Sequence, residues 1–293
     1  MNYTLKNEYY EATVASYGAE LISLKNKDGI ELMWQNPDKK YWNDHAPILF
    51  PLCGAIKDKK AFYKGISYDM KMHGFALTSE FELVEKTEGS VTLALKSSEE
   101  TKKAYPFDFT LTVRYSLEGD KVVFSSTVKN EGEDVLPFSF GWHPGFNLPC
   151  DDKTDIEDYA VKFDNKDEVT WVHFYFDFDT PNEYLPYKTP GSKYQFCEEE
   201  IYKYDTMIFK DMGNKVTLSA EGRPFSLDMT WTDNLPVLCL WKSEHNDAKF
   251  ICIEPWTHDT LRGEMSNHWE HRDAHRLNPG ESEDFEYTLK FSF

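Results

Sequence analysis

Two segments of the sequence place a side chain that can transfer protons beside a point where the backbone must turn. In 138-FSFGWHPGFNLP-149, His143 stands between a tryptophan and a proline, with a glycine on either side of that trio. In 250-FICIEPWTH-258, Glu254 ends an apolar run and precedes a proline. Burial raises the pKa of a carboxyl group toward the range of a general base, and the ordinary pKa of histidine suits a general acid. The two segments therefore supply one candidate general base and one candidate general acid.

Each signal also has an ordinary structural explanation. A histidine beside a tryptophan is commonly a hydrogen-bonded packing residue, and a glutamate before a proline is commonly a charge at the rim of a sheet. A third segment, 72-MHGFAL-77, contributes His73 before a glycine and carries the same ambiguity. The combination of the three segments, rather than any one of them, points to a site.

The elements that must position these side chains read as β-strands. Aromatic residues make up 16% of the 293 residues, which favours pleated sheet over helix. Alternating residues and turn signals predict hairpins or strand pairs at 11–27 (around Gly18), 81–97, 109–130 and 215–231, and a strand at 283–293. We therefore expect an all-β fold, a large antiparallel β-sandwich, forming a single domain over residues 1–293.

Helical pattern is thin. The segment 98–105 is the best short helix candidate, with Ser98 as its N-cap. The segment 177–196 is rich in Pro and Tyr and is interpreted as a long surface connection, with a lid over the site as the alternative.

Composition excludes several classes of partner. The formal net charge of -19 argues against nucleic acid and anionic membranes, which require a positive face. The five cysteines are odd in number, widely spaced and without a CxxC pair, which favours a reduced, cytoplasmic protein over a disulfide framework. We expect no signal peptide and no membrane span, because no apolar run has the required length.

Taken together, the chemistry-bearing segments resemble the aldose 1-epimerase (galactose mutarotase) family, in its LacX-like branch. The likeness extends over nearly the whole chain and keeps the order of the motifs. It is carried by 47-PILFPLCGAI-56, 72-MHGFAL-77, 138-FSFGWHPGFNLP-149, 204-YDTMIF-209, 252-CIEPW-256 and 277-LNPGE-281.

This resemblance implies a galactose mutarotase-like β-sandwich that interconverts the α and β anomers of a free aldose such as galactose or glucose. It places the general base on Glu254 and the general acid on His143, which would act from opposite sides of the sugar ring. It places sugar contacts on His73 and Asp205. The reaction needs no metal, nucleotide or redox cofactor, and no phosphate-binding loop motif is present in the sequence.

Aromatic residues beside these motifs offer faces on which a sugar could stack. Trp142 and Trp256 are assigned to substrate binding. Phe75 and Phe146 are at least as well explained as part of the sandwich core.

Two positions depart from the family pattern. Relatives commonly carry an arginine where this chain has Ala55, and relatives that act on hexose 6-phosphates read HGFAR where this chain has Leu77. Loss of both guanidinium groups removes the natural bidentate contacts for a phosphate. The sequence therefore favours a neutral sugar over a sugar phosphate.

Other interpretations stay open at the level of sequence. A non-catalytic carbohydrate-binding or sugar-sensing protein would share the sandwich and its aromatic residues, and a glycoside hydrolase would use Asp205 with Glu254 as its two carboxylates. His268, His271 and His275 would lie on one face of a helix and could bind zinc, although an extended tail is the preferred interpretation of that segment.

Overall fold

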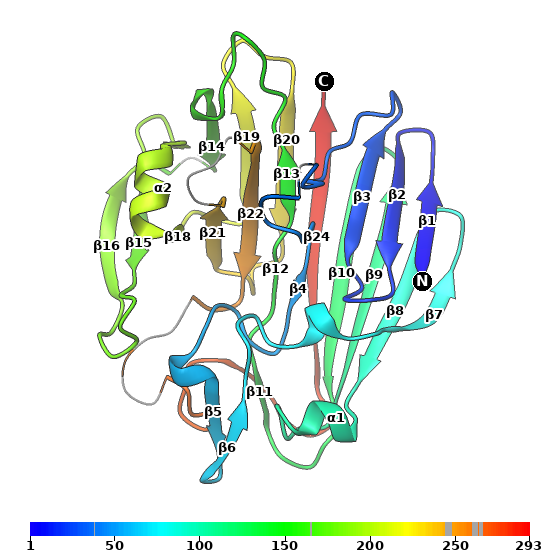
Figure 1. Cartoon of the computed structure of the whole chain (residues 1–293), viewed down its shortest axis with the longest axis vertical. Coiled ribbons are helices and arrows are strands. Elements are labelled where there is room, and N and C mark those ends of the chain that lie inside the picture. Colours follow the sequence, from blue (N-terminus) through cyan, green and yellow to red (C-terminus); the bar gives the residue numbers. More distant parts are fainter. Residues whose placement is uncertain (38, 165, 244–247, 260–262, 264–265) are drawn as a thin grey trace.

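The computed structural model describes residues 1–37, 39–164, 166–243, 248–259, 263 and 266–293. In this part of the chain the larger of two main sheets has nine antiparallel strands. In spatial order they are β17 (Lys193–Gln195), β14 (Tyr159–Phe163), β19 (Lys215–Ala220), β20 (Ser226–Trp231), β24 (Ser282–Ser292), β10 (Lys121–Asn130), β9 (Phe109–Glu118), β8 (Ser90–Lys96) and β7 (Glu82–Lys86). Figure 1 shows β24 running through the middle of the molecule, between β20 and β10.

The second main sheet has eight strands in the described residues and carries the site segments. Its order is β16 (Glu183–Lys188), β15 (Glu168–His173), β18 (Thr206–Lys210), β21 (Val237–Trp241), β22 (Phe250–Trp256), β12 (Gly141–Trp142) and β4 (Ile48–Leu49), and β13 (Gly145–Asn147) also pairs with β22.

The core lies between the two sheets and is filled largely by aromatic rings. Alternate residues of β24 point inward, so that Phe285 stacks on Phe140 with ring centroids 4.8 Å apart. Trp142 stacks on Phe124 of β10 at 4.8 Å and meets Tyr287 of β24 at 5.6 Å. These contacts join the two sheets directly and identify the fold as an all-β sandwich.

Smaller elements complete the molecule. They are a three-stranded sheet of β1 (Asn2–Lys6), β2 (Tyr10–Ala15) and β3 (Leu21–Asn26), the pairs β5 (Lys60–Tyr63) with β6 (Ile66–Asp69) and β11 (Leu136–Phe138) with β23 (His275–Leu277), the α-helices α1 (Glu99–Lys102) and α2 (Glu198–Tyr204), and the 3-10 turns η1 (Lys57–Lys59), η2 (Ala76–Thr78) and η3 (Ile156–Asp158). Figure 1 shows α2 at one flank and β1–β3 at the other. No helix in the described residues is long and apolar enough to cross a bilayer.

The expected hairpins are present as β7–β8, β9–β10 and β19–β20, and β2 and β3 flank Gly18. The short helix α1 begins after Ser98, whose hydroxyl accepts a hydrogen bond from the backbone N–H of Thr101 at 3.2 Å. The interpretation of 177–196 as a long connection is wrong, because β16 and β17 both lie within it. Helix α2 was not expected.

The histidine-rich segment 268–275 is neither a helix nor an extended tail. It forms turns, and only His275 enters a strand. The ring of His268 stacks on that of Phe62, with centroids 4.8 Å apart, whereas Nδ1 of His275 lies 2.7 Å from Oε2 of Glu283. These three histidines form no common ligand group within the described part of the chain.

Candidate active site

One face of the eight-stranded sheet forms the floor of a cavity of about 520 Å³. Strand register places Glu254 of β22 opposite Cys239 of β21, and Cys239 opposite Ile208 of β18, so the three side chains form a row across this face. All seven residues of β22 are buried, since one face of the strand meets the core and the other meets the cavity floor. A cavity of this size suits a small-molecule ligand.

His143 is placed beside Glu254 by an interruption between two short strands. Gly141 of β12 pairs with Trp256, and Gly145 of β13 pairs with Cys252. His143 lies midway between these two glycines and is therefore beside Glu254, which lies midway between their partners on β22. The His143 Nε2 and Glu254 Oε2 atoms are 3.4 Å apart. The side chains are therefore neighbours at the base of the cavity and do not face each other across the width of a sugar ring, as the sequence interpretation had supposed.

The two glycines that flank His143 make room for aromatic rings. A Cβ atom at Gly141 would lie 2.4 Å from Cδ1 of Trp256, and one at Gly145 would lie 2.7 Å from Cζ3 of Trp42. The Trp42 ring lies against the imidazole of His143 with centroids 4.8 Å apart. Close approach of these indoles to the backbone thus explains the glycines around His143.

Burial shifts the proton affinities of both groups in opposite directions. It raises the pKa of the Glu254 carboxyl well above its ordinary value of 4.5, and the nearby charge of Asp205 adds to the rise. It lowers the pKa of His143 well below 6.5, and the neighbouring His73 adds to that fall. Both shifts favour the uncharged forms, so when the pair holds a single proton, burial favours its location on the carboxyl group.

The polar atoms of this pair are exceptions to the rule that buried polar groups are hydrogen-bonded. Both carboxylate oxygens of Glu254, Nδ1 of His143 and Nε1 of Trp256 are buried without a hydrogen bond of good geometry, although the Trp256 N–H and the Cys239 thiol lie near enough to the carboxyl group to oppose the rise in its pKa. Such groups at the base of a cavity can be satisfied by the hydroxyl groups of a ligand.

His73 lies at the side of the same cavity in a constrained backbone conformation, with φ of 63°. The Nδ1 atom of the His73 ring accepts a hydrogen bond from the backbone N–H of Gly54 at 3.2 Å, and the backbone N–H of His73 donates to the Gly54 carbonyl at 2.8 Å. Burial lowers the pKa of His73 to about 4, so the ring is neutral and carries its proton on Nε2 at neutral pH. The His73 and His143 ring centroids are 5.6 Å apart.

Asp205 reaches the cavity from the end of α2. It also has a positive φ of 63°, a conformation that is uncommon outside glycine and asparagine and is often held at functional positions. The structure thus brings His73, His143, Asp205, Glu254 and Trp256 together as residues that line one cavity.

Trp142 is the exception among the residues assigned from the sequence. It is fully buried between the sheets and does not line the cavity, because the alternation of β12 points it away from the cavity face. Its indole N–H donates to the Ala46 carbonyl at 3.0 Å, and this contact makes it a structural residue. Phe146 is likewise in the core, and Phe75 packs against the core.

Sequence reasoning missed several residues that line the cavity. Trp42, Trp241 and Phe174 contribute aromatic surface, and Asp44 contributes a carboxyl group. Their segments carry no proton-transfer motif, and a concentration of tryptophans near 34–42 was the one available signal.

Three side chains of metal-ligating types meet at the base of the cavity. One nitrogen, sulfur or oxygen atom from each of His143, Cys252 and Glu254 lies within 4.8 Å of the others. Burial raises the pKa of the Cys252 thiol well above 9.0, which makes it a poor thiolate donor. The arrangement is better suited to proton transfer.

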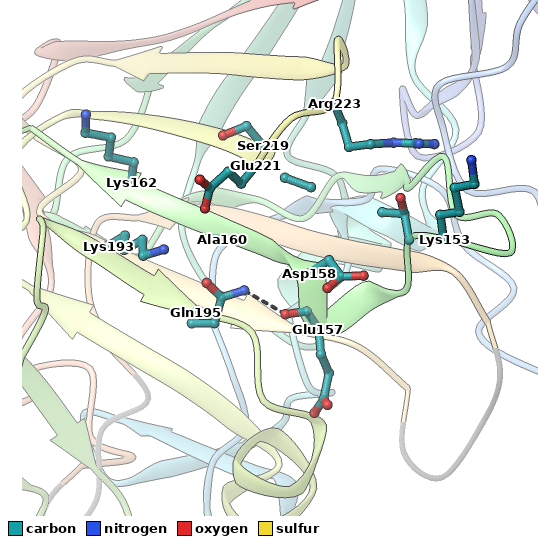
Figure 2. A pocket seen from close by; sticks show the side chains of 12 residues that line it. Lys153, Glu157, Asp158, Ala160, Lys162, Lys193, Gln195, Ser219, Glu221 and Arg223 are labelled. Atoms are coloured by element: carbon teal, nitrogen blue, oxygen red, sulfur yellow. Dashed lines mark hydrogen bonds between the residues drawn. The ribbon is translucent and has the colours of Figure 1, made fainter.

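A second hollow, of about 590 Å³, lies over β14, β17 and β19. Figure 2 shows its mixed lining of lysines and carboxylates, with the Gln195 amide donating to the Glu157 carbonyl at 2.6 Å. Its described lining residues include no histidine, cysteine or aromatic ring, and they offer no acid–base pair.

Comparison with known proteins gives one consistent result. A family model described as aldose 1-epimerase matches residues 1–290. The chromosomal LacX protein of Lactococcus lactis is 32% identical over 269 residues, which cover 88% of each chain. A galactose mutarotase related enzyme from Lactobacillus acidophilus superposes with a TM-score of 0.90 at 29% identity, covering 99% of this chain and 97% of that one. A galactose mutarotase-like protein from Lactobacillus casei superposes with a TM-score of 0.86 at 26% identity, covering 99% and 100%.

Proposed function

The chain belongs to the aldose 1-epimerase family, and from this premise we propose that it interconverts the α and β anomers of an uncharged aldose. The observation that carries the proposal is the buried pair of His143 and Glu254, 3.4 Å apart at the base of a cavity of suitable size. The carboxylate oxygens of Glu254 and Nδ1 of His143 are buried without a hydrogen bond of good geometry, which supports a role toward a ligand.

The closeness of the pair matches the chemistry of the anomeric carbon. The two oxygens that exchange protons in mutarotation, the C1 hydroxyl and the ring oxygen, are both bonded to C1 and are therefore close together. Glu254 takes the hydroxyl proton while the bond between C1 and the ring oxygen breaks, and His143 gives a proton to that oxygen. The open aldehyde rotates about C1–C2, and the reverse transfers close the ring on its other face.

The proton must lie on His143 when the closed sugar reacts. Burial favours its location on Glu254, so binding must shift it across the 3.4 Å between the two groups. Sugar hydroxyls that hydrogen-bond the carboxylate stabilise its charged form and favour this transfer. One proton shared between two groups is all that the cycle requires.

The other lining residues bind and orient the sugar. His73 donates from Nε2, Asp205 accepts from sugar hydroxyls, and Trp256 offers its indole face and N–H. Ala55 and Leu77 line the cavity without charge, and no lysine or arginine is among its described lining residues. This lining supports a neutral sugar over a sugar phosphate.

Anomer exchange followed by NMR tests the proposal. Fresh α-galactose, α-glucose and galactose 6-phosphate are followed with the wild-type protein, Glu254→Gln and His143→Asn. We expect acceleration of the two neutral sugars by the wild type, and a loss of about 10²-fold or more in each variant. Galactose 6-phosphate is expected to exchange at the buffer rate.

Two exposed residues provide matched controls. Glu286→Gln and His271→Asn make the same chemical changes away from the cavity and should retain full activity. A wild-type protein that binds these sugars but leaves their exchange at the buffer rate would instead be a sugar-binding or sugar-sensing protein.

A further inference from the structure

The base of the candidate active site holds three different donor atoms within reach of one ion. One atom from each of His143, Cys252 and Glu254 lies within 4.8 Å of the other two, and Nε2 of His143 is 3.4 Å from Oε2 of Glu254. In a tetrahedral zinc site with bonds of about 2.0–2.3 Å, the ligand atoms lie about 3.3–3.8 Å apart. The imidazole and the carboxyl group already have this spacing, and the thiol needs to approach by no more than about 1 Å.

Strand geometry places the sulfur atom beside the acid–base pair. Cys252 and Glu254 are two residues apart on β22, so both side chains leave the same face of the strand. Gly145 pairs with Cys252, and a Cβ atom at Gly145 would lie 3.5 Å from the Cys252 Sγ atom. The thiol is therefore packed against the segment that carries His143.

The donor atoms are available to an ion that enters the cavity. Both carboxylate oxygens of Glu254 are buried without a hydrogen bond of good geometry. His143 and Glu254 line the cavity, and its other described lining residues include Asp44 and Asp205 but no lysine or arginine. With a net charge of -19, the protein as a whole attracts cations.

The mixture of donors selects the class of ion. Nitrogen, sulfur and carboxylate oxygen together suit Zn²⁺ and related transition metals, whereas Mg²⁺ and Ca²⁺ take oxygen ligands. Three protein donors leave the fourth position of a tetrahedral site to water, which the cavity of about 520 Å³ can supply.

We propose that His143, Cys252 and Glu254 bind a divalent cation of the Zn²⁺ class, and that this ion is a reversible inhibitor of anomer exchange. The site stands on the donor geometry, whereas the inhibition rests on the proposed function, because the ion occupies the two groups that transfer protons. Binding releases the proton of the Cys252 thiol and the proton that His143 and Glu254 share, so that a thiolate, a carboxylate and a neutral imidazole face the ion. Because a buried thiol loses its proton reluctantly, the ion is held less tightly than in a structural zinc site.

Anomer exchange of galactose tests the inhibition, with and without about 100 µM ZnCl₂ in a buffer free of chelators. For the wild type we expect the apparent KM to rise at least about tenfold at unchanged kcat, as for a competitive inhibitor with a Ki of about 10 µM. A chelator should restore the starting value, and MgCl₂ at the same concentration should have no effect. Inhibition of an active wild type by both salts alike, or by neither, would overturn the proposal.

Variants identify the sulfur donor, each compared with its own rate in the absence of metal. Cys252→Ala removes one of three donors and should reduce the effect of ZnCl₂ on KM at least about fivefold. Cys239→Ala removes a second thiol that faces Glu254 from β21, and Cys150→Ala removes a half-buried thiol; both lie outside the donor group and should keep the sensitivity of the wild type. Inhibition that persists in Cys252→Ala, or that is lost equally in Cys239→Ala, would contradict the assignment.

Direct binding separates the metal site from the proposed function. Calorimetry with ZnCl₂ and the thiolate-to-metal absorption band of added Co²⁺ should both report a site in the wild type that is lost in Cys252→Ala. If the wild type does not accelerate anomer exchange but this site is present, the proposed function fails and the metal site stands. If the wild type is active and neither measurement detects a site that depends on Cys252, the metal site is overturned while the proposed function is untouched.

Discussion

At the scale of single residues, the site works by placing two groups of opposed proton affinity within reach of one carbon atom. His143 and Glu254 approach to 3.4 Å, and both are held in an environment that disfavours charge. A pair of this kind titrates as a unit, with one proton added at low pH and one removed at high pH.

The pH dependence of anomer exchange should reveal this coupling. With ordinary pKa values of 4.5 and 6.5, the singly protonated pair would dominate only between those values and activity would fall above 6.5. Because burial lowers the pKa of His143 and raises that of Glu254, protonation of His143 sets the loss of activity on the acid side, and deprotonation of Glu254 sets the loss on the basic side. We expect the loss of kcat/KM on the acid side to lie well below pH 6.5 and the loss on the basic side to lie well above pH 4.5, with the singly protonated pair active between them.

The measurement is kcat/KM for galactose from about pH 4 to pH 9, with the buffer-catalysed rate subtracted. A loss of activity on the acid side that begins near pH 6.5 would contradict the lowered pKa of His143. Phe176 lines the cavity and is largely exposed, so Phe176→Tyr should keep the pH profile of the wild type.

The glycine before the catalytic segment should be intolerant of a single methyl group. Gly141→Ala puts a Cβ atom 2.4 Å from the Trp256 ring, so the indole or strand β12 must move. We expect anomer exchange to fall about tenfold or more, since displacement by about 1 Å is costly for catalytic geometry. Gly89→Ala is the control, because its Cβ atom would meet Leu117 at an ordinary 3.7 Å. Wild-type activity in Gly141→Ala would show that the indole position is irrelevant.

Residue identity was more predictable than residue geometry. Short motifs pointed to His73, His143, Asp205, Glu254 and Trp256, which line one cavity. The motifs could not tell that Trp142 faces the core, because the direction of a two-residue strand depends on its partners. Nor could they give the close approach of His143 to Glu254, which depends on pairing between strands far apart in the sequence.

At the scale of elements, the segment 45–47 positions the chain around His143. His143 donates its backbone N–H to the Pro47 carbonyl at 3.0 Å, and Gly145 donates to the His45 carbonyl at 2.8 Å. The same segment is held from behind by Glu20. One carboxylate oxygen of Glu20 accepts from the backbone N–H of His45 at 2.6 Å and of Ala46 at 2.9 Å.

Glu20 should therefore act as a positioning residue. Glu20→Ala removes both contacts to the segment, and we expect kcat to fall about tenfold with little change in KM, because His73, Asp205 and Trp256 stay in place. Glu20→Gln keeps an acceptor oxygen and should recover most of the loss. An unchanged kcat in a folded Glu20→Ala, with folding checked by circular dichroism, would show that segment 45–47 holds its place without this carboxylate.

Elements built from local signals were predictable, and elements built from distant contacts were not. The hairpins carry their alternation and their turns within about twenty residues. In contrast, β16 contains Pro186 and several exposed residues, and it is a strand because it pairs along its length with β15. Helix α2 begins with three glutamates, which are favourable in the first turn of a helix. The helix is nevertheless too short for its sequence pattern to predict it.

At the scale of the whole molecule, repulsion between like charges opposes the stability that the packed core provides. The net charge of -19 is spread over a protein whose interior is dense with aromatic rings. Like charges on a compact body repel, and this repulsion is screened by salt.

The melting temperature should therefore rise with ionic strength near neutrality. Between about 10 mM and 150 mM NaCl we expect an increase of about 2 °C or more, the shift that ~1 kcal/mol produces in a chain of this size. Calorimetry at pH 7 measures it. The same experiment near pH 4.9, the isoelectric point of the sequence, is the control and should show little change. A melting temperature that falls with salt at pH 7 would mean that surface ion pairs outweigh the repulsion.

Strand β24 joins the two halves of the nine-stranded sheet, with β20 and its neighbours on one side and β10 and its neighbours on the other. Each half contains hairpins that can form early from local contacts. In contrast, Leu289 of β24 pairs with Val122 of β10, and more than half of the chain separates the two residues in the sequence. Closing so long a loop is slow, and folding rates fall as such distant pairings dominate. Until β24 docks, the edges of β20 and β10 are open to strands of other chains, so the refolding molecule is most prone to aggregation at this stage.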